Sequence, residues 1–455
     1  MMNKTKKILI GVAIVIGLLL ILPFLIPMQT YLRQTERIAS EKLGRPVSIN
    51  AAHLLFLPSP RVVAGDIVVG ENQELKVESI VVIPTIGSLF STTKIIDLTI
   101  SKPILKKAAL DFISALTAKK SESGEAAAVN IRHIKIDELN LVWPDAKYPA
   151  INAKAALAGD NKLESATLET LDGKLKASVT PKVTPNGDEQ LIVVTANKWT
   201  MPVGLPLLID NAKLEMHLKG SKLSIPKIDI ALYGGKLMGD AVLNWEESKG
   251  KPNWKTSGNL SVNNLSVQQP SSMVSKAVYL SGNLFGKGNF SATAKEARKL
   301  PDNLQTNFQF KVNNGVLHGL DLVKVASLLI KQKQGDGETQ FDEFSGVLNS
   351  AGKQYHLRDI KISSGLLSAK GQVKVMPNKA LGGTMLVNVK NSMGLTAIPL
   401  EGSGTVSKPV VLPSKAAIAG AIAGTAILGP GVGTSLGIRA GGAVDKLKGL
   451  FGDKK

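Results

Sequence analysis

The residues that could perform chemistry are few, and the most recognisable pattern among them is a serine between two glycines. Gly433, Ser435 and Gly437 match the G-x-S-x-G pattern of serine hydrolases. In those enzymes the serine follows a strand and precedes a helix, and a histidine lies further along the chain. Here the serine lies in a glycine-rich tail, and no histidine follows it. A hydrolase that uses Ser435 is therefore the third of three hypotheses, behind the two developed below.

Metal chemistry has no better support. None of the histidines has a second histidine or a cysteine at ligand spacing, and the five are His53, His133, His217, His318 and His356. A cluster of carboxylates could attract calcium but lacks the spacing of an EF-hand loop and indicates a solvated loop; it consists of Asp336, Glu338, Asp342 and Glu343. Cysteine is absent, which excludes disulfides, thiolate metal sites and a cysteine nucleophile. We predict a protein that is not an enzyme, with no catalytic residue, metal or cofactor.

The amino-terminal stretch from Ile8 to Met28 determines where the remaining chain is placed. It is apolar over about 20 residues, enough for a helix that crosses a bilayer, and Lys4, Lys6 and Lys7 precede it. The basic flank predicts a cytoplasmic amino terminus and export of everything that follows. A cleaved signal peptide is the alternative, but the run is longer than usual and no small-x-small cleavage site follows it. The residues representing this membrane anchor are Ile8, Leu18, Leu22 and Phe24.

The charge balance indicates an anionic partner. The chain has 55 Lys and Arg against 36 Asp and Glu, a formal charge of +19. Aromatic residues make up only 4% of the chain, and no RNP-like, zinc-finger or basic-helix pattern accompanies the charge, which argues against nucleic acid. Together with the export signal, the charge favours membrane lipid or cell-envelope glycolipid. A basic surface that only keeps the protein soluble is the alternative.

Most of the exported chain alternates apolar and polar residues with the period of two that is typical of an antiparallel sheet with one apolar face. Nine side chains from three such segments are candidates for an apolar binding surface: Leu214, Met216, Leu218, Ile228, Ile230, Leu232, Phe308, Phe310 and Val312. Each apolar face must be covered. A second sheet could close it into a sandwich or barrel, or it could stay open for an apolar ligand. Any of the nine could equally belong to a closed β core.

Helical spacing is rare by comparison. It occurs at Thr30 to Leu43, Ile104 to Leu116, Ser272 to Tyr279, Leu320 to Lys331 and Ala416 to Leu428. The polar segment Lys119 to Glu125 indicates a flexible boundary. We predict four regions: a cytoplasmic stub and transmembrane anchor at 1–29, an amino-terminal region of strands and helices at 30–125, a β region at 126–413 and a Gly/Ala-rich tail, helical or mobile, at 414–455.

Several short motifs, in order along the chain, resemble the AsmA family. The amino-terminal motifs are Leu-Gly-Arg-Pro-Val at 43–47, Leu-Pro-Ser-Pro-Arg at 57–61 and Ile-Asp-Leu-Thr-Ile-Ser-Lys-Pro at 96–103. The carboxy-terminal motifs are Leu-Tyr-Gly-Gly-Lys-Leu at 232–237, Asn-Gly-Val-Leu-His-Gly-Leu-Asp-Leu at 314–322, Thr-Gln-Phe-Asp at 339–342 and the run from Ile398 to Pro409. The resemblance implies a periplasmic protein held in the inner membrane of a two-membrane bacterium, with a repeating β-groove shared with bridge-like lipid-transfer proteins and a role in outer-membrane homeostasis.

Residues and resemblance together predict a mainly β fold: an elongated antiparallel sheet curled into an open groove, with an amino-terminal transmembrane helix and a few short helices. The first functional hypothesis is a conduit in which the groove shelters the acyl chains of phospholipid or a lipopolysaccharide-type glycolipid, because each methylene removed from water favours binding by roughly 0.8 kcal/mol. The second is a scaffold or assembly factor for outer-membrane or other envelope proteins that binds partners through its sheet edges and holds no lipid.

Overall fold

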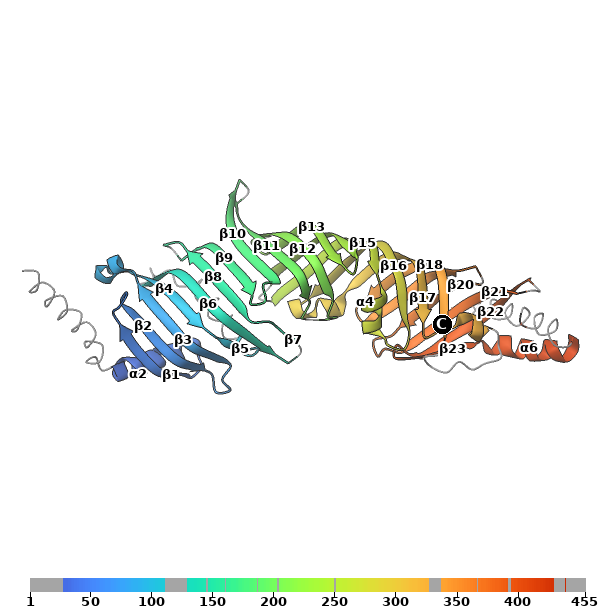
Figure 1. The fold of residues 1–455 in the computed structure, drawn as a ribbon, viewed down its shortest axis with the longest axis horizontal. Helices are drawn as coiled ribbons and strands as arrows, with labels where there is room; N and C mark the ends of the chain where they lie inside the picture. The colour runs from blue at the N-terminus through green and yellow to red at the C-terminus, as the bar shows by residue number, and fades with distance from the viewer. Residues whose placement is uncertain are drawn as a thin grey trace, which may run out of the picture. The chain divides into compact units, whose positions relative to one another are not determined.

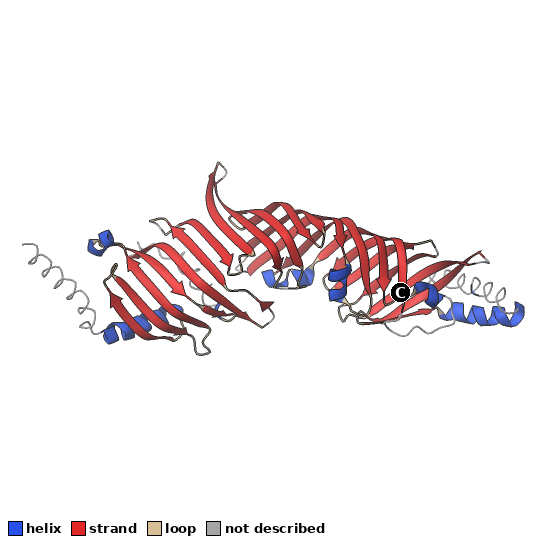
Figure 2. Ribbon diagram, viewed as in Figure 1, coloured by secondary structure: helices blue, strands red, loops and turns tan. Residues whose placement is uncertain are grey.

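The computed structural model describes residues 28–110, 129–144, 146–159, 161–185, 187–202, 204–248, 251–326, 337–365, 367–391, 394–428 and 438. These residues are mainly β, with few and short helices (Figures 1 and 2). The chain divides into two compact units between Pro206 and Leu207. We call the first unit 1 and the second unit 2.

Unit 1 contains strands β1 to β11. Their bounds are β1 Val47–Leu55, β2 Arg61–Val69, β3 Leu75–Pro84, β4 Lys94–Ser101, β5 Ile104–Lys106, β6 Val129–Trp143, β7 Ala146–Lys147, β8 Ile151–Leu157, β9 Leu163–Thr170, β10 Leu175–Thr184 and β11 Gly187–Thr200. Helix α2 (Met28–Leu43) precedes β1, and a 3₁₀ turn, η1 (Ile86–Phe90), lies between β3 and β4. Neighbouring strands are antiparallel except at one seam, where β6 pairs in parallel with both β4 and β5.

The sheet is antiparallel as expected, and this parallel seam is the exception among the described pairings. A parallel pair needs a long crossover connection, and here the connection leaves β5 after Lys106 and returns at Val129. The helix predicted from Ile104 is wrong at its start, because Ile104–Lys106 form β5; residues 111–128 lie outside the described part of the chain. Strand pairing overrides helical spacing here, since Ile104 and Leu105 pair with β6 and with β3.

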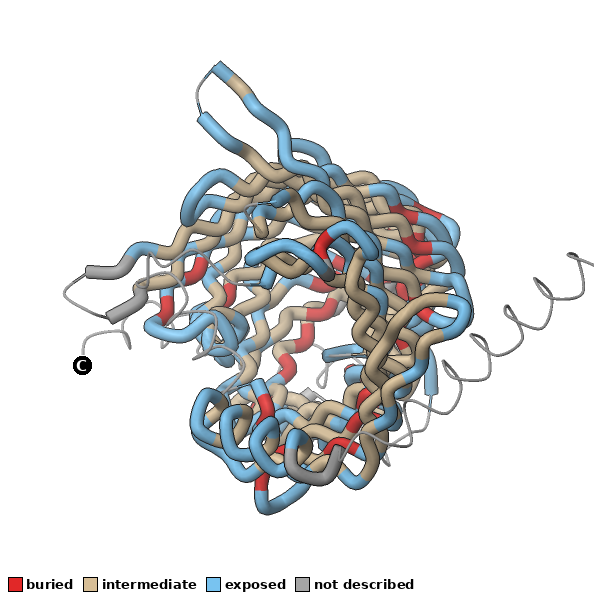
Figure 3. The backbone as a smooth tube through the Cα atoms, turned by 90° about the vertical axis from the view of Figure 1, so that its left-hand side faces the viewer, coloured by how far each residue is buried: buried red, intermediate tan, exposed pale blue. Residues whose placement is uncertain are grey.

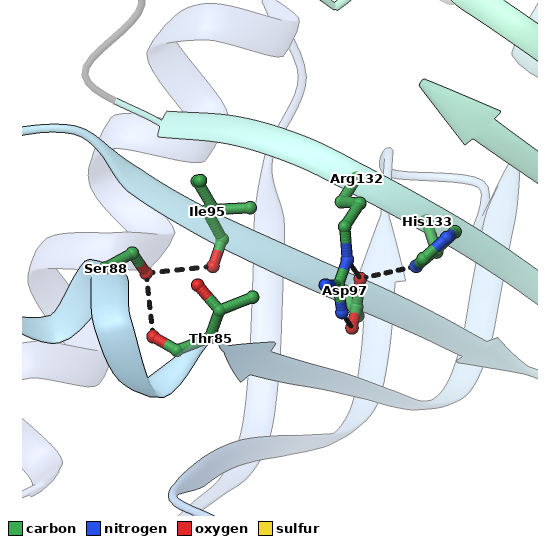
Figure 4. A network of polar contacts seen from close by, with 6 residues as sticks. All are labelled: Thr85, Ser88, Ile95, Asp97, Arg132 and His133. Atoms are coloured by element: carbon green, nitrogen blue, oxygen red, sulfur yellow. Dashed lines mark hydrogen bonds and ion pairs between the residues drawn. The ribbon is translucent and has the colours of Figure 1, made fainter. Parts of the chain in front are cut away.

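A polar cluster bridges the seam between β4 and β6 (Figure 4). Asp97 of β4 receives two hydrogen bonds from the Arg132 guanidinium, Nε to Oδ1 at 3.1 Å and Nη2 to Oδ2 at 2.5 Å. His133 Nδ1 lies 2.9 Å from Asp97 Oδ1. The hydrogen bonds from Arg132, with a smaller contribution from His133, hold the pKa of Asp97 below its usual value, although partial burial opposes them.

Unit 2 contains strands β12 to β23, each paired antiparallel with the next along the chain where the pairing is described. Their bounds are β12 Leu208–Lys219, β13 Lys222–Leu232, β14 Gly235–Ser248, β15 Lys251–Ser266, β16 Tyr279–Ala294, β17 Gln305–His318, β18 Glu338–Ala351, β19 Gln354–Ser363, β20 Leu367–Val375, β21 Leu381–Asn391, β22 Gly394–Thr405 and β23 Lys408–Pro413. Three helices, α4 (Gln268–Val274), α5 (Leu322–Ala326) and α6 (Lys415–Leu428), and two 3₁₀ turns, η2 (Ala297–Lys299) and η3 (Pro301–Asn303), accompany them.

The sheet of unit 2 curls strongly at its carboxy-terminal end. The buried hydroxyl of Ser275, just after α4, donates a hydrogen bond to the carbonyl oxygen of Val406 in the β22–β23 turn at 3.0 Å. In a flat sheet β16 and β22 would lie roughly 30 Å apart, because neighbouring strands are about 4.8 Å apart. The sheet must therefore turn over on itself to bring Ser275 and Val406 together.

Helix α5 fills the inside of this curl and forms the main core. Leu322, Val325 and Ala326 are 1%, 2% and 0% exposed. They join a cluster of buried side chains that includes Val312 of β17 and Val387 of β21. The helix predicted from Leu320 to Lys331 is thus present as α5 up to Ala326, and residues 327–336 lie outside the described part.

The predicted helix from Thr30 to Leu43 is present as α2, and the helix placed at Ser272 to Tyr279 begins and ends earlier, as α4. The anchor residues Ile8, Leu18, Leu22 and Phe24 lie outside the described residues. Among the described helices, none has both the length and the apolar character needed to cross a bilayer. The predicted region limits after residues 29, 125 and 413 stay predictions, and the division between Pro206 and Leu207 was not among them.

Candidate functional site: an apolar sheet face

One face of the unit 1 sheet consists of aliphatic side chains in register. Residues paired across neighbouring strands lie on the same face, so the pairing traces rows that run across the strands. The first row is Leu54, Val62, Val82, Leu98, Ile134, Ala155, Ala166, Val179 and Ile192. The second row is Ala52, Ala64, Ile80, Ile100, Ile136, Ala153, Leu168, Ala177 and Val194. We call these two rows the unit 1 floor.

The unit 1 floor is neither a buried core nor a free surface. All eighteen side chains have intermediate exposure, and Figure 3 shows that intermediate positions dominate along the strands while buried ones are sparse. Among the described elements, β8 to β11 contact mainly their neighbouring strands, and no described helix packs on them to a comparable extent. At about 4.8 Å per strand, nine strands give rows roughly 40 Å long. Over β2 to β4 the second row touches a small buried cluster, at Ala64, Ile80 and Ile100. Over β8 to β11 the aliphatic surface has no comparable cover among the described elements, and this part is the most ligand-like feature of unit 1.

A corresponding row crosses unit 2 from β13 to β23. Its members are Ile228, Gly239, Leu260, Gly288, Phe308, Leu348, Leu357, Val373, Gly383, Gly402 and Val411. All eleven are apolar or glycine, and all have intermediate exposure. We call this row the unit 2 floor.

Glycines lie under phenylalanine rings on the apolar face of unit 2, where Phe308 belongs to the unit 2 floor and Phe341 to the buried core. A Cβ at Gly286 would lie 2.6 Å from ring atoms of Phe308, and a Cβ at Gly315 would lie 2.6 Å from the ring of Phe341. Gly258 bears the same relation to Phe290, at 2.8 Å. Each ring therefore lies against the backbone of the neighbouring strand instead of standing out from the sheet. A bulky aromatic side chain thus adds apolar area to the face without obstructing it.

All nine candidates from the sequence lie on this apolar face of unit 2. Leu218 pairs with Leu223, and Ala212 pairs with Ile230; because side chains alternate along β12, Leu214 and Met216 share their face. The nine side chains differ, however, in how far the protein itself buries them. Leu232 and Val312 are 6% and 2% exposed and belong to the core beneath α5, whereas the other seven have intermediate exposure. The protein itself covers the face near α5 and leaves it accessible elsewhere.

The sequence candidates did not include the unit 1 floor. Four of its positions in the central strands are alanines, Ala153, Ala155, Ala166 and Ala177. Alanine contributes little to the apolar–polar alternation by which a strand is recognised in a sequence. The alternation of Ile134, Lys135 and Ile136 was the available signal. Only strand register shows that these small residues continue the two rows that pass through Leu98 and Ile100.

The described residues add no support for catalytic chemistry. They contain no group of three or more metal-ligating side chains, and the five histidines stay apart. His318, the most enclosed of those in an ion pair, contacts Glu338 Oε1 at 2.8 Å and Ser281 Oγ at 3.0 Å and stacks on Tyr279. These contacts fix the base of the loop that carries α5. Ser435 and Asp336 lie outside the described residues.

Comparison with known proteins gives one finding. The model of a family described as the AsmA family matches residues 87–352. The match runs from η1 in unit 1 to the turn after β18 in unit 2 and therefore includes much of both floors. A comparison with curated proteins finds no significant match.

Proposed function

The chain belongs to the AsmA family, and on this premise we propose that it holds the acyl chains of phospholipid or envelope glycolipid on its two apolar floors and moves them within the cell envelope. The unit 1 floor carries the proposal: eighteen aliphatic side chains form two unbroken rows, and no described helix packs extensively on the part of these rows that crosses β8 to β11. In water such a surface is unfavourable, and covering it with hydrocarbon favours binding by about 25 cal/mol per Å² of apolar surface.

The dimensions suit a lipid tail. One leaflet of a bilayer is about 15 Å deep in hydrocarbon, and a row of nine strands is roughly 40 Å long. A chain can therefore lie along a row with its headgroup in water. Because both rows are aliphatic throughout, no position along them offers a polar group that would stop a sliding chain, as movement along the sheet requires.

The strand edges argue against the alternative, a scaffold that binds envelope proteins by strand addition. At the β1 edge, the N–H of Val47 donates to Ser40 Oγ at 2.9 Å and the N–H of Ile49 donates to Glu36 Oε1 at 2.7 Å, so α2 already occupies two edge donors. Such covered edges hinder pairing with another chain.

At the β23 edge, proline has the same effect. The N–H of Ser414 donates to the carbonyl oxygen of Pro399 on β22. Because backbone groups alternate along a strand, the backbone nitrogen and carbonyl groups of Pro409, Val411 and Pro413 point away from β22, toward the free edge. Two of these three positions have no N–H to offer a new strand.

Photo-crosslinking in living cells tests the proposal on the full chain. A photoreactive phenylalanine analogue is placed at Ala166, on the unit 1 floor, or at the adjacent Thr167, which faces the other side and is exposed. After illumination, mass spectrometry measures lipid attached to the protein. We expect at least tenfold more phospholipid or glycolipid on the Ala166 variant than on the Thr167 variant. Equal labelling at the two positions, or labelling by envelope proteins alone, would overturn the proposal.

A further inference from the structure

An apolar pocket lies where the unit 2 floor reaches the curl. Its volume is about 160 Å³. One side is formed by the last part of the floor, Val373, Gly383, Gly402 and Val411, and the opposite wall by Leu320 and Leu322. None of the described residues that line it is charged.

A pair of glycines creates the hollow. Gly383 of β21 pairs directly with Gly402 of β22, so the floor has no side chain at two neighbouring positions. A Cβ at Gly383 would lie 2.7 Å from the carbonyl oxygen of Gln372, which leaves no room for one. At Gly402 the nearest atom to a Cβ would be 3.8 Å away. The space above Gly402 is thus empty and could hold other atoms.

The opposite wall is rigidly held. The hydroxyl of Thr339 donates to the carbonyl oxygen of Leu320 at 2.7 Å and accepts the N–H of Leu322 at 2.8 Å. Thr339 itself is 3% exposed. Leu322 and Leu400, both 1% exposed, form the inner side of the pocket. The wall of the pocket and its inner side are therefore formed by buried groups that hydrogen bonds hold in place.

We propose that this pocket receives the methyl end of one acyl chain of a lipid lying on the unit 2 floor, and so sets the position at which that lipid stops. The inference rests on the proposed function. A similar aliphatic cavity of ~150 Å³ stays dry and binds benzene, so this pocket has room for about five or six carbons. It is lined by apolar groups, with buried residues at its inner side, so a chain end fits whereas a phosphate or sugar would lose its hydration without a polar partner.

Continuity with the floor identifies the occupant. Gly383, Gly402 and Val411 are at once the last members of the row that begins at Ile228 and the side of the pocket. A chain that follows the row is therefore led into the pocket, with its terminal methyl first. The fixed depth of the pocket then makes the stopping point depend on chain length.

A lipid labelled at its tail tests this on the full chain in membranes of living cells. The probe is a phosphatidylethanolamine with a diazirine next to the methyl end of one chain, and peptide mass spectrometry locates the crosslinks. Gly402→Leu fills the pocket, and Gly402→Ala fills it partly with a methyl group that the 3.8 Å spacing accommodates. Glu401→Leu is the matched control, because Glu401 is exposed and faces the other side of β22.

We expect crosslinks on the segments 381–385 and 400–411 in the unchanged protein and in Glu401→Leu, reduced about tenfold in Gly402→Leu and less in Gly402→Ala. Crosslinks on the unit 1 and unit 2 floors but not on these segments would overturn the pocket and leave the proposed function standing. Crosslinks that are unchanged in both Gly402 variants would also overturn it. A protein with no crosslink at any position would refute the pocket and the proposed function together.

Discussion

Thr339 Oγ1 lies 2.8 Å from the backbone nitrogen of Leu322 and 2.7 Å from the carbonyl oxygen of Leu320, so one buried hydroxyl satisfies a donor and an acceptor of the segment entering α5. Thr339→Val keeps the shape but leaves both backbone groups unpaired. Each buried unpaired group costs about 1–3 kcal/mol. We expect the free energy of unfolding of unit 2 to fall by at least about 2 kcal/mol, measured by urea denaturation.

Thr339→Ser is the control for this change, since it retains the hydroxyl and loses only a methyl group. It should recover most of the stability. If Thr339→Val unfolds at the same urea concentration as the unchanged protein, water must replace the hydroxyl, and the rigid wall of the pocket has no basis.

The glycines under the phenylalanines give a second prediction. A methyl group at Gly286 would lie 2.6 Å from the ring of Phe308 and 2.7 Å from the backbone oxygen of Gln309, which cannot move without breaking the strand pairing. Gly286→Ala should therefore lower stability by about 1–3 kcal/mol, as overpacking usually does. Gly402→Ala, where the nearest atom is 3.8 Å away, should be neutral. A similar thermal midpoint for the two variants would show that the rings do not lie against the glycines.

Strand alternation, and with it the apolar face of unit 2, could be predicted from the sequence because Leu214, Met216 and Leu218 repeat at the period of the sheet. Which part of that face is buried by other parts of the protein could not be predicted. Leu232 and Leu214 have the same pattern, yet Leu232 is buried with the α5 core. That difference depends on contacts with α5, which is far along the chain, and no local period encodes them.

The parallel seam was also beyond sequence reasoning. The spacing of Ile104 and Leu105 fits a helix as well as a strand, and pairing with β6 decides the outcome. Motif resemblance identified the family correctly: the AsmA-like segments at 96–103, 232–237, 314–322 and 339–342 fall inside the matched region, whereas those at 43–47, 57–61 and 398–409 lie outside it. Resemblance to a family gives no atomic positions. That Gly383 and Gly402 lie side by side follows only from the pairing of β21 with β22.

The cluster at the seam predicts a dependence of stability on pH. Because hydrogen bonds from Arg132 hold the pKa of Asp97 below its ordinary value, the folded state is stabilised above about pH 4, the unfolded pKa. This contribution is lost as the pH falls through the lower folded pKa. The Arg132 side chain is 48% exposed, so the contribution is about 1 kcal/mol or less. Asp97→Asn should lower the thermal midpoint at pH 7 and leave it unchanged near pH 2; an equal effect at both would exclude a role for the charge.

A carboxylate introduced on the apolar face can abolish lipid binding without unfolding the protein, provided that the substituted side chain is not buried. Ala166→Asp places a carboxylate on the half-buried unit 1 floor, where water reaches it, so the protein should fold while lipid binding falls at least tenfold. Thr167→Asp carries the same charge on the opposite, exposed side and should bind lipid normally.

Leu232→Asp, by contrast, buries a charge at a position that is 6% exposed and should unfold unit 2. Lipid bound to each full-length variant is measured by mass spectrometry after crosslinking, and folding by circular dichroism. Unchanged lipid on folded Ala166→Asp would mean that the rows of unit 1 do not hold the acyl chains.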